Sequence, residues 1–393
     1  MAILLNSNIT TTLNDNVYVS AIEPYIKEAI DIYALDKQDQ LFLKEYKSAL
    51  DKIYLSITAK EQDSIIFNSC SNESTSQIYL SAYMSQILTG RKNSIILFER
   101  APLDELKVAR FLESQGCRVH RIPSTIDGTI DIEILKSYIN EKTAFVSVPM
   151  VDDESGVIQP LEEVSQICAL HNVPLYSNAS WAVGKIPVDV TRLPVSYLSL
   201  EGALIHGPKD IAMLYIKEDA PPLLPIVYGS DLEQNGLRAM PKNLSSIIGL
   251  GKALEDAIDA LDYEMEDVRD LRDDLEQGLL EIDGSYSLAP WALRVPTVAI
   301  MAFEGVHASM LLERLAKRDI LAYSYARFNT GNFERKSLVE IAGLDSSLKH
   351  SVIGFALNIY NTKDEIEQTI EAVKEEVAKI RLEFSGNICK ESK

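Results

Sequence analysis

The fold is decided by the stretch Val173–Lys217, which reads V-P-L-Y-S-N-A-S-W-A-V-G-K-I-P-V-D-V-T-R-L-P-V-S-Y-L-S-L-E-G-A-L-I-H-G-P-K-D-I-A-M-L-Y-I-K. Proline, glycine and aspartate divide it into three short apolar runs, a pattern typical of buried strands. The runs are Val173–Tyr176, Val195–Leu200 and Ala212–Ile216. Polar residues follow the first two runs, at Ser177–Trp181 and Glu201–His206. Because α/β sheets bind ligands at strand ends, we expect the functional site there.

Apolar runs and amphipathic helical patterns also alternate in the part of the chain that precedes this stretch. The predicted strands are Ser64–Phe67, Ser94–Phe98, Cys117–Ile122 and Thr143–Val148. The predicted helices between and after them are Leu103–Gln115, Ile132–Ile139 and Leu161–His171. Such alternation predicts an α/β fold in which helices wrap a mostly parallel sheet.

Length and composition limit the classes of protein that the chain can represent. Its 393 residues exceed what one core usually supports, and its content of 46% hydrophobic and 24% charged residues is that of a globular protein. The net charge of −20 argues against a nucleic-acid partner, because phosphate contacts need a basic surface. Four cysteines without framework spacing, and no apolar run of membrane-spanning length, predict a cytoplasmic protein without a membrane partner.

Three parts of the opening stretch carry a resemblance to a known family. They are A-V-G-K-I-P-V-D-V at 182–190, L-P-V-S-Y-L-S-L-E-G at 193–202 and H-G-P-K at 206–209. This frame resembles the cysteine desulfurases of the NifS/IscS type, which are class V aminotransferase relatives. The resemblance implies the pyridoxal-phosphate (PLP)-dependent transferase fold type I. That fold has a large domain with a mostly parallel seven-stranded sheet and a small α+β C-terminal domain.

The resemblance also implies a division of the chain. We expect residues 1–250 to form the large domain, with the segment 1–15 contributing to the small domain. Residues 251–282 would form a long linking helix, and residues 283–384 would form the small domain. The last residues, 385–393, would be a flexible tail.

The residues that carry the family's chemistry in this stretch are replaced. Where the family has an Asp that pairs with the pyridine nitrogen, this chain has Asn178, and Trp181 takes the place of a cofactor-binding Gln. The family's turn Ser-x-His-Lys, whose Lys forms the Schiff base, corresponds to Glu201, Ala203 and Leu204. The frame is kept, but the cofactor-binding residues differ.

The phosphate-binding positions of the resemblance are altered as well. The loop that holds the PLP phosphate in the family corresponds to the segment around Ser71 and Asn72, where Asn72 replaces a Thr. Arg238 matches a family Arg and is kept. Pro241 takes the place of a Thr that reaches the phosphate of the partner subunit in the family.

Further replacements fall on residues that contact the cofactor ring or the substrate in the family. Glu99 takes the place of a His that stacks on the pyridine ring, and Asp153 replaces an Asn near the cofactor. Arg327 lies nearest to the position of the catalytic Cys, and Gly354 takes the place of the Arg that binds the substrate carboxylate.

These replacements argue against the family reaction. A PLP enzyme needs an amine for the Schiff base and a carboxylate for the pyridinium proton, which Leu204 and Asn178 do not supply. A carboxylate at Glu201 would repel the phosphate by roughly 4 kcal/mol at ~4 Å and an effective dielectric of about 20. We therefore expect no bound cofactor and no catalytic residues at the family positions.

Three other residues could have either a functional or a structural role. Lys209 is the lysine nearest to the Schiff-base position, but active family members carry the same Gly-Pro-Lys, so a structural role is favoured. His206 lies in the same turn and is expected to pack or to cap. Cys389, in the polar tail, is either a mobile thiol carrier or an incidental exposed thiol, and the second interpretation is favoured.

Metal and nucleotide signatures are absent from the sequence, and no metal site is expected. One hypothesis concerns the acidic replacements Glu99, Asp153 and Glu201. If the fold brings their carboxylates together, they would form an acidic pocket able to take a cation or an amine.

The sequence thus leads to one function and two alternatives. The first is a NifS-like desulfurase homologue that has lost PLP binding and activity and acts as a scaffold or regulatory protein, in sulfur transfer or iron–sulfur assembly. One alternative is an active PLP-dependent cysteine desulfurase or lyase that uses a non-standard lysine. Another is a repurposed pocket with PLP-free activity. A homodimer and a protein partner in sulfur metabolism are expected from the resemblance.

Overall fold

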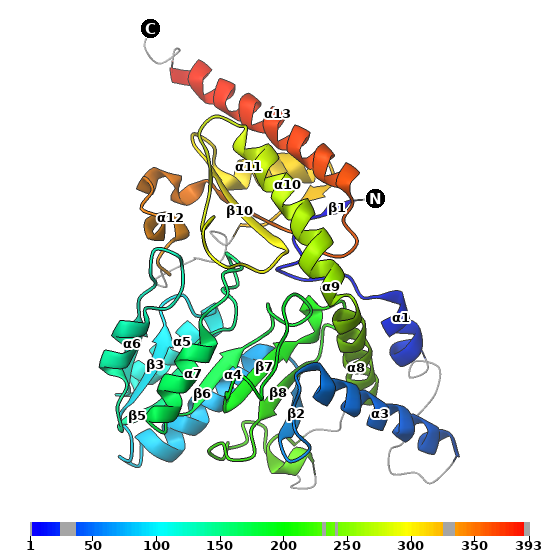
Figure 1. Ribbon diagram of the computed structural model, residues 1–393, viewed down its shortest axis with the longest axis vertical. Helices are drawn as coiled ribbons and strands as arrows, with labels where there is room; N and C mark the ends of the chain where they lie inside the picture. Colours follow the sequence, from blue (N-terminus) through cyan, green and yellow to red (C-terminus); the bar gives the residue numbers. More distant parts are fainter. Residues whose placement is uncertain (1, 24–36, 230–232, 240–242, 325–334, 389–393) are drawn as a thin grey trace.

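The computed structural model describes residues 2–23, 37–229, 233–239, 243–324 and 335–388. Its larger sheet has seven strands in the order β2-β8-β7-β6-β5-β3-β4 (Figure 1). The strands are β2 (Ser64–Asn68), β3 (Ser94–Phe98), β4 (Arg118–Ile122), β5 (Thr143–Ser147), β6 (Leu175–Asn178), β7 (Tyr197–Glu201) and β8 (Ala212–Ile216). Strand β8 is antiparallel to both of its neighbours, and the other pairs are parallel. The predicted mostly parallel seven-stranded sheet is confirmed.

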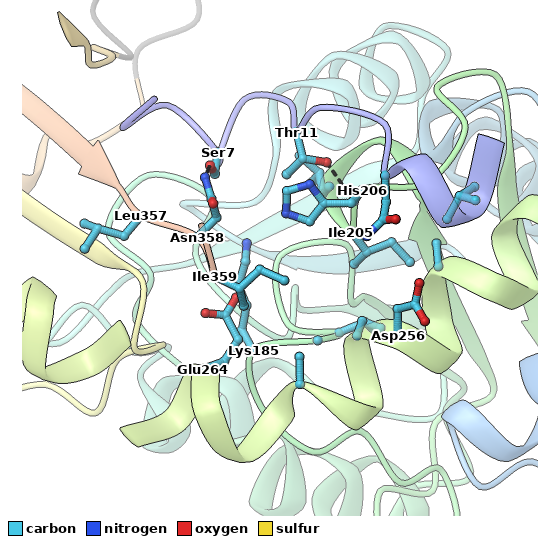
Figure 2. A pocket seen from close by; sticks show the side chains of 18 residues that line it. Ser7, Thr11, Lys185, Ile205, His206, Asp256, Glu264, Leu357, Asn358 and Ile359 are labelled. Atoms are coloured by element: carbon cyan, nitrogen blue, oxygen red, sulfur yellow. Dashed lines mark hydrogen bonds between the residues drawn. The ribbon is translucent and has the colours of Figure 1, made fainter. Parts of the chain in front are cut away.

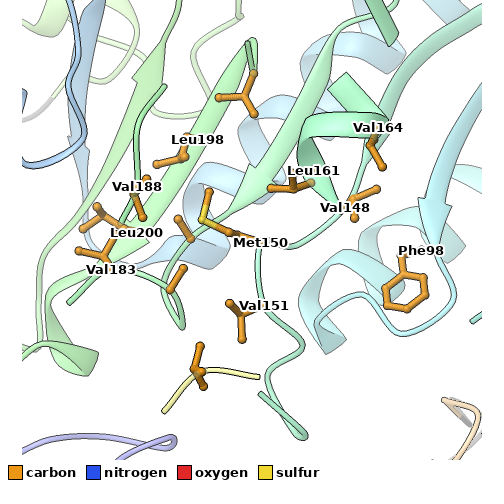
Figure 3. Packing of buried hydrophobic residues seen from close by; sticks show 14 of the residues in the cluster. Phe98, Val148, Met150, Val151, Leu161, Val164, Val183, Val188, Leu198 and Leu200 are labelled. Carbon is orange, nitrogen blue, oxygen red and sulfur yellow. The ribbon is translucent and has the colours of Figure 1, made fainter. Parts of the chain in front are cut away.

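Helices cover both faces of this sheet because its strands are apolar on both sides. In β3, Ile95 and Leu97 pack into one cluster, whereas Ile96 and Phe98 pack into the other, as the pleat of a strand requires. The first cluster is completed by α4 (Ser71–Ala82) and α5 (Leu103–Ser114). The second, part of which is drawn in Figure 3, is completed by α3 (Lys37–Ser56), α6 (Ile132–Tyr138), α7 (Leu161–Leu170) and α8 (Leu244–Asp259).

A second, smaller sheet is built from the C-terminal part of the chain. Its order is β12-β10-β9, with antiparallel pairs throughout. The strands are β9 (Ser285–Ser287), β10 (Val298–Phe303) and β12 (Val352–Ala356). The helices α10 (Arg269–Leu280), α11 (Ala308–Ala316) and α13 (Lys363–Ile388) share one hydrophobic cluster with these strands. The N-terminal strand β1 (Ile3–Leu4) pairs with β11 (Ile320–Leu321), so the first residues lie beside this smaller sheet.

A nearly continuous helical run joins the two sheets (Figure 1). It passes from α8 through α9 (Leu261–Tyr263) and the π-helical turn η5 (Glu264–Val268) into α10. The sequence predicted a linking helix at 251–282, and α8 already begins at Leu244, where it packs on α3. The proposed domain boundaries themselves stay a prediction.

The remaining elements are short. They are α1 (Asp15–Val17), η1 (Tyr18–Ile22), η2 (Tyr83–Ile87), η3 (Gly202–Leu204), η4 (Gln234–Gly236), α12 (Leu338–Ile341) and η7 (Ser346–His350). In the part of the chain that the structure describes, no helix combines the length and the apolar character needed to cross a membrane. The cytoplasmic location stays a prediction.

Gly354 lies in the centre of β12 and faces the ring of Tyr323. A Cβ atom at this position would lie 2.2 Å from Cζ of Tyr323, far inside van der Waals contact. Tyr323 also forms an isolated bridge with Gly354, and its hydroxyl donates to the carbonyl of Glu154 at 3.0 Å. The space that the resemblance assigns to a substrate-binding Arg is therefore occupied by an aromatic ring.

This packing predicts that Gly354→Ala lowers the free energy of unfolding by about 1–3 kcal/mol, because the new methyl group overpacks the contact with Tyr323. Chemical denaturation measures the change. Gly343→Ala is the comparison variant. The positive φ of 66° at Gly343 makes an alanine there strained, but no atom lies within 4 Å of its new Cβ, so this variant has backbone strain without overpacking. In the double variant Gly354→Ala/Tyr323→Ala, the cost of the Gly354 change should shrink. An equal cost in both backgrounds would contradict the steric explanation.

Candidate functional site

The carboxyl ends of β6 and β7 lie next to each other and carry the first two predicted site residues. Asn178 ends β6 and is buried. Its Oδ1 accepts from the backbone N–H of Ser180 at 3.0 Å, whereas its Nδ2 has no hydrogen-bond partner. Glu201 ends β7, and its carboxylate accepts from the hydroxyl of Ser71 at 2.8 Å. An amide and a carboxylate thus occupy neighbouring strand ends.

Ser71 is the first residue of α4, at the segment that the resemblance relates to the family's phosphate loop. A helix N-terminus offers free N–H groups and a positive dipole, both of which favour an anion. Here a protein carboxylate, that of Glu201, already lies at the Ser71 hydroxyl. A carboxylate of the protein therefore lies at the segment to which the resemblance assigns the phosphate.

Arg238 is also engaged by a carboxylate. Its guanidinium forms a two-pronged ion pair with Glu73, in which Nη2 lies 3.1 Å from Oε2. Burial would raise the pKa of Glu73, but the hydrogen bonds from Arg238 and Ser69 outweigh it and lower that pKa. The positive charge of Arg238 is thus largely neutralised within the protein.

A cavity opens beside these strand ends, and we call it the strand-end cavity. Its empty volume is about 980 Å³, including its opening to solvent. The polar and aromatic residues that line it are Asn8, Asn72, Asp104, Lys107, Asp153, Glu154, Trp181 and Arg335. Trp181 donates from its indole nitrogen to the carbonyl of Asn8 at 3.1 Å, so its ring is fixed in the wall. Three of the sequence-predicted positions, Asn72, Asp153 and Trp181, therefore meet at one cavity.

A buried ion cluster supports the floor of this cavity. Arg100 is fully buried, and its Nε and Nη2 donate to Asp152 at 3.0 and 3.1 Å. Arg335 adds a second guanidinium, which lies 3.2 Å from Asp152 and 2.6 Å from Asp153. Burial opposes ionisation of Asp152, but Arg100 and Arg335 lower its pKa far below the usual range. Burial raises the pKa of Asp153 to about 6, although Arg335 opposes the shift.

The sequence analysis missed this cluster, and no signal in the sequence marks it. Arg100, Asp152 and Arg335 stand far apart in the chain, and paired charges of this kind become visible only when the fold brings them together. Arg335 directly follows residues outside the described part of the chain.

Glu99 does not belong to the strand-end cavity. Its carboxylate accepts from the backbone N–H and from the hydroxyl of Ser124, both at 2.6 Å. The residues of the same loop that line the cavity are Pro102 and Leu103. That Glu99 takes the place of the family's ring-stacking His stays a prediction.

The predicted acidic pocket does not form. Glu99 bonds Ser124, Asp153 pairs with Arg335, and Glu201 bonds Ser71. Within the described residues, no group of three or more His, Cys, Asp or Glu side chains could hold a metal ion. The hypothesis of a shared cation site at these three carboxylates is therefore wrong for the described residues.

Leu204 and Ala203 lie in the turn η3, just after β7. The carbonyl of Ala203 accepts from both the backbone N–H and the hydroxyl of Thr11 at 2.9 Å. Leu204 is 6% exposed and lines a different cavity, together with Lys185 and His206. The residue that the resemblance relates to the Schiff-base position thus borders a second cavity.

The other candidates are placed as follows. Lys209 is exposed and lines none of the cavities described here. His206 packs edge-on against Tyr360, with the ring centroids 5.1 Å apart, and burial lowers its pKa. Arg327, Pro241 and Cys389 lie outside the described residues.

The comparisons with known proteins identify the class. The family model "Aminotransferase class-V" matches residues 3–369, which is most of the chain. The chain belongs to the aminotransferase class-V family.

Within that family, its relatives are cysteine desulfurases of the NifS and IscS kind. Cysteine desulfurase NifS of Azotobacter vinelandii is 30% identical over 384 residues, covering 96% of this chain and 93% of NifS. Cysteine desulfurase IscS of Mannheimia succiniciproducens is 32% identical over 276 residues, covering 70% and 68%. A solved NifS-like protein superposes with a TM-score of 0.87 at 24% identity, over 96% of this chain and 100% of the other. The resemblance and the fold type I architecture are confirmed.

This membership corrects one expectation. We expected no cofactor, but the cysteine desulfurases to which this chain is homologous depend on PLP, and nothing in the comparisons sets this chain apart from them in that respect. The inference from single replacements to a cofactor-free protein was wrong, because loss of a covalent anchor does not by itself remove non-covalent binding. PLP is the cofactor that the family implies.

The residues at the site fit PLP in part. The Nδ2 of Asn178 is buried without a partner at the strand end, but the Ser71 hydroxyl at the start of α4 is already bonded to the carboxylate of Glu201. A covalent anchor is not offered at the family position, because Leu204 stands there and borders the second cavity. We derive no reaction step through PLP for this chain.

A buried polar network lies beneath the strand-end cavity, and its centre is Glu105. The carboxylate accepts from the hydroxyls of Tyr79, at 3.0 Å, and Ser147. Burial and repulsion from Asp104 raise the pKa of Glu105 to about 8, although the hydroxyls of Ser147 and Tyr79 oppose the shift. At neutral pH the folded protein therefore holds a proton at this site.

Glu105 makes the stability pH-dependent in a predictable direction. The pKa rises from 4.5 to about 8 on folding, so the unfolded chain loses a proton in this window that the folded protein keeps. The free energy of unfolding should fall as pH rises through the window, by at most about 1.4 kcal/mol per pH unit. Glu105→Gln should remove this contribution, because its amide does not titrate.

Denaturant titrations at several pH values measure the slope. Glu113→Gln is the matched control, since Glu113 lies exposed on the same helix and its pKa is lowered by Arg121. That variant should keep the wild-type slope near neutral pH. Identical slopes for the wild type and Glu105→Gln would contradict the assignment.

Proposed function

We propose that this chain is a NifS/IscS-family protein that does not perform cysteine desulfuration by the family route. It would act instead as a scaffold or regulatory protein, in sulfur transfer or iron–sulfur assembly. The proposal concerns the reaction and the covalent anchor; PLP remains the cofactor implied by the family. The observation that carries it is Leu204, an apolar and nearly buried side chain at the Schiff-base position.

The charges around the strand-end cavity support the same proposal. The family reaction requires groups that bind an anionic phosphate and a substrate carboxylate, and free cations serve this purpose best. Arg238 is paired with Glu73, and Arg335 is paired with Asp152 and Asp153. An incoming anion would compete with protein carboxylates for both guanidinium groups.

A second candidate function rests on Lys107. This lysine projects from α5 and lines the strand-end cavity, together with Trp181 and Asp153. Among the lysines in the described parts of the chain, it is the one found in that lining. A non-standard lysine would make an active PLP-dependent desulfurase or lyase conceivable, and Lys107 is better located for this role than Lys209.

One assay separates the two candidates. The purified protein is incubated with PLP, L-cysteine and a thiol reductant, and sulfide and alanine are measured. The expected result is no product above the level produced by PLP and the reductant without protein, because no lysine occupies the family position. Treatment with borohydride should leave no PLP attached to a lysine, as peptide mass spectrometry reports.

Matched lysine variants make the outcome decisive. Stoichiometric sulfide and alanine that vanish in Lys107→Met and persist in Lys209→Met would overturn the first proposal in favour of the second. PLP attached to Lys107 after borohydride treatment would lead to the same conclusion. The stability of both variants is checked by thermal unfolding, since both lysines are exposed and a large loss of stability is not expected.

We further propose a homodimer, which the resemblance implies because the family forms its cofactor site across two subunits. Sedimentation velocity over a range of protein concentrations should give the mass of two chains. A single species with the mass of one chain at every concentration would contradict this proposal, and it would leave the question of the reaction untouched.

A further inference from the structure

A second cavity lies where the two sheets meet, and we call it the Lys185 cavity. Its walls come from the N-terminal segment, the turn after β7, helix α8 and the segment after β12 (Figure 2). The empty volume is about 540 Å³, including the opening to solvent. No sequence-based expectation and no comparison assigns a ligand to this space.

Lys185 is the unusual member of its wall. The residue is 5% exposed, and its Nζ has no hydrogen-bond partner. Burial lowers the pKa of Lys185 to about 8, and the carboxylate of Glu264 opposes the shift. A buried ammonium without a partner is costly, so a group that supplies acceptors would bind favourably.

Glu264 is the corresponding acidic member. It is 7% exposed, its Oε2 has no hydrogen-bond partner, and it opens the π-helical turn η5. Burial raises the pKa of Glu264 to about 7, and Lys185 opposes the shift. Figure 2 shows its carboxylate in the same part of the cavity wall as Lys185. The charge of each side chain favours the ionised form of the other, yet the two make no hydrogen bond with each other.

Most other polar groups in the wall are already occupied. Thr11 bonds the turn at Ala203 and His206, and the Ser7 hydroxyl accepts from Asn358 at 2.8 Å. Asp256 lies 2.7 Å from Lys252 through Oδ1, whereas its Oδ2 has no partner. The buried side-chain atoms of this wall that have no hydrogen-bond partner are thus Nζ of Lys185, Oε2 of Glu264 and Oδ2 of Asp256.

The rest of the wall is apolar. It includes Leu204, Ile205, Leu357 and Ile359. A ligand with a single charge would satisfy Lys185 or Glu264 and leave the other buried ion without a partner. A ligand with both charges would satisfy both, and its own net charge of zero would lower the cost of its burial.

We propose that the Lys185 cavity binds a small zwitterion that carries one carboxylate, one ammonium group and a short apolar body. The carboxylate accepts from Nζ of Lys185, and the ammonium group donates to Glu264. The apolar body packs against Leu204 and Ile359. This site is separate from the strand-end cavity, and the proposal does not depend on whether the chain is catalytic.

The charge requirement is tested first with the unmodified protein. L-valine is compared with isovalerate, which lacks the amine, and with isobutylamine, which lacks the carboxylate. Isothermal titration should give an affinity for L-valine at least about tenfold higher than for either analogue, because hydrogen bonds between ions are the strong ones. Equal binding of the three probes, or no binding of L-valine at millimolar concentration, would overturn the proposal.

Variants then locate the site. Lys185→Met and Glu264→Gln should each lower the affinity for L-valine by about tenfold or more. The matched control is Lys374→Met, because Lys374 forms an exposed ion pair with Glu281 far along the chain, and its affinity should equal that of the wild type. L-valine binding that survives Lys185→Met unchanged would place the ligand elsewhere and overturn the proposal.

A third variant covers the case in which the charge variants fail to fold. Ala260 lines the cavity and is partly exposed, so Ala260→Leu fills space without removing a charge. It should abolish L-valine binding while the far-ultraviolet circular dichroism stays unchanged. Full binding by a folded Ala260→Leu protein would overturn the proposal, as would a crystal structure in which Lys185 and Glu264 close into a direct ion pair in the presence of L-valine.

Discussion

The buried pair between Arg100 and Asp152 is the interaction on which the strand-end cavity depends. Arg100 follows β3, Asp152 follows β5, and Arg335 joins them from the segment that precedes α12. Two guanidinium groups around a buried carboxylate are stable only as a set, since removing one partner of a buried ion pair typically costs about 3–5 kcal/mol. The cluster thus fixes the floor of the cavity and ties the C-terminal part of the chain to the large sheet.

The charges of the two cavities are arranged differently. Arg335 in the wall of the strand-end cavity is matched by carboxylates of the protein, and so is Arg238, which pairs with Glu73 of α4. At the Lys185 cavity, Lys185 and Glu264 are buried but not hydrogen-bonded to each other. The ion pairs of Arg238 and Arg335 stabilise the fold and weaken the binding of an anion. At the Lys185 cavity, Nζ of Lys185 and Oε2 of Glu264 remain without hydrogen-bond partners, so a ligand can bind to them. Family analogy points to the strand-end cavity as the ligand site, whereas the unpaired buried charges lie in the Lys185 cavity.

Much of the architecture could be predicted from the sequence, because periodicity and turn residues report local structure directly. The run Ser94–Phe98 is a strand with the predicted bounds, and the seven-stranded sheet follows from the alternation of strands and helices. Predicted Val195–Leu200 is shifted to Tyr197–Glu201, because Val195 still belongs to the turn after Pro194. Strand ends are set by sheet pairing, which a single sequence does not display.

The site was predicted less well, for a physical reason. The resemblance led to Asn178, Trp181 and Glu201, which lie at or just after the ends of β6 and β7. It did not reveal that the carboxylate of Glu99 bonds Ser124 in a neighbouring loop. Side-chain direction in a loop depends on such partners, and so do the ion pairs of Arg335. Neither depends on a local pattern that a sequence could reveal.

The position of Leu204 connects these observations. In the resemblance this residue replaces the amine that holds the cofactor, and in the structure it lines the Lys185 cavity. An apolar side chain at this position adds wall surface to the space that Lys185 and Glu264 also line. The proposed zwitterion needs such a surface for its apolar body, because the two buried ions would be occupied by its charged groups. The residue on which the proposed loss of the family reaction rests is thus also a part of the proposed binding site.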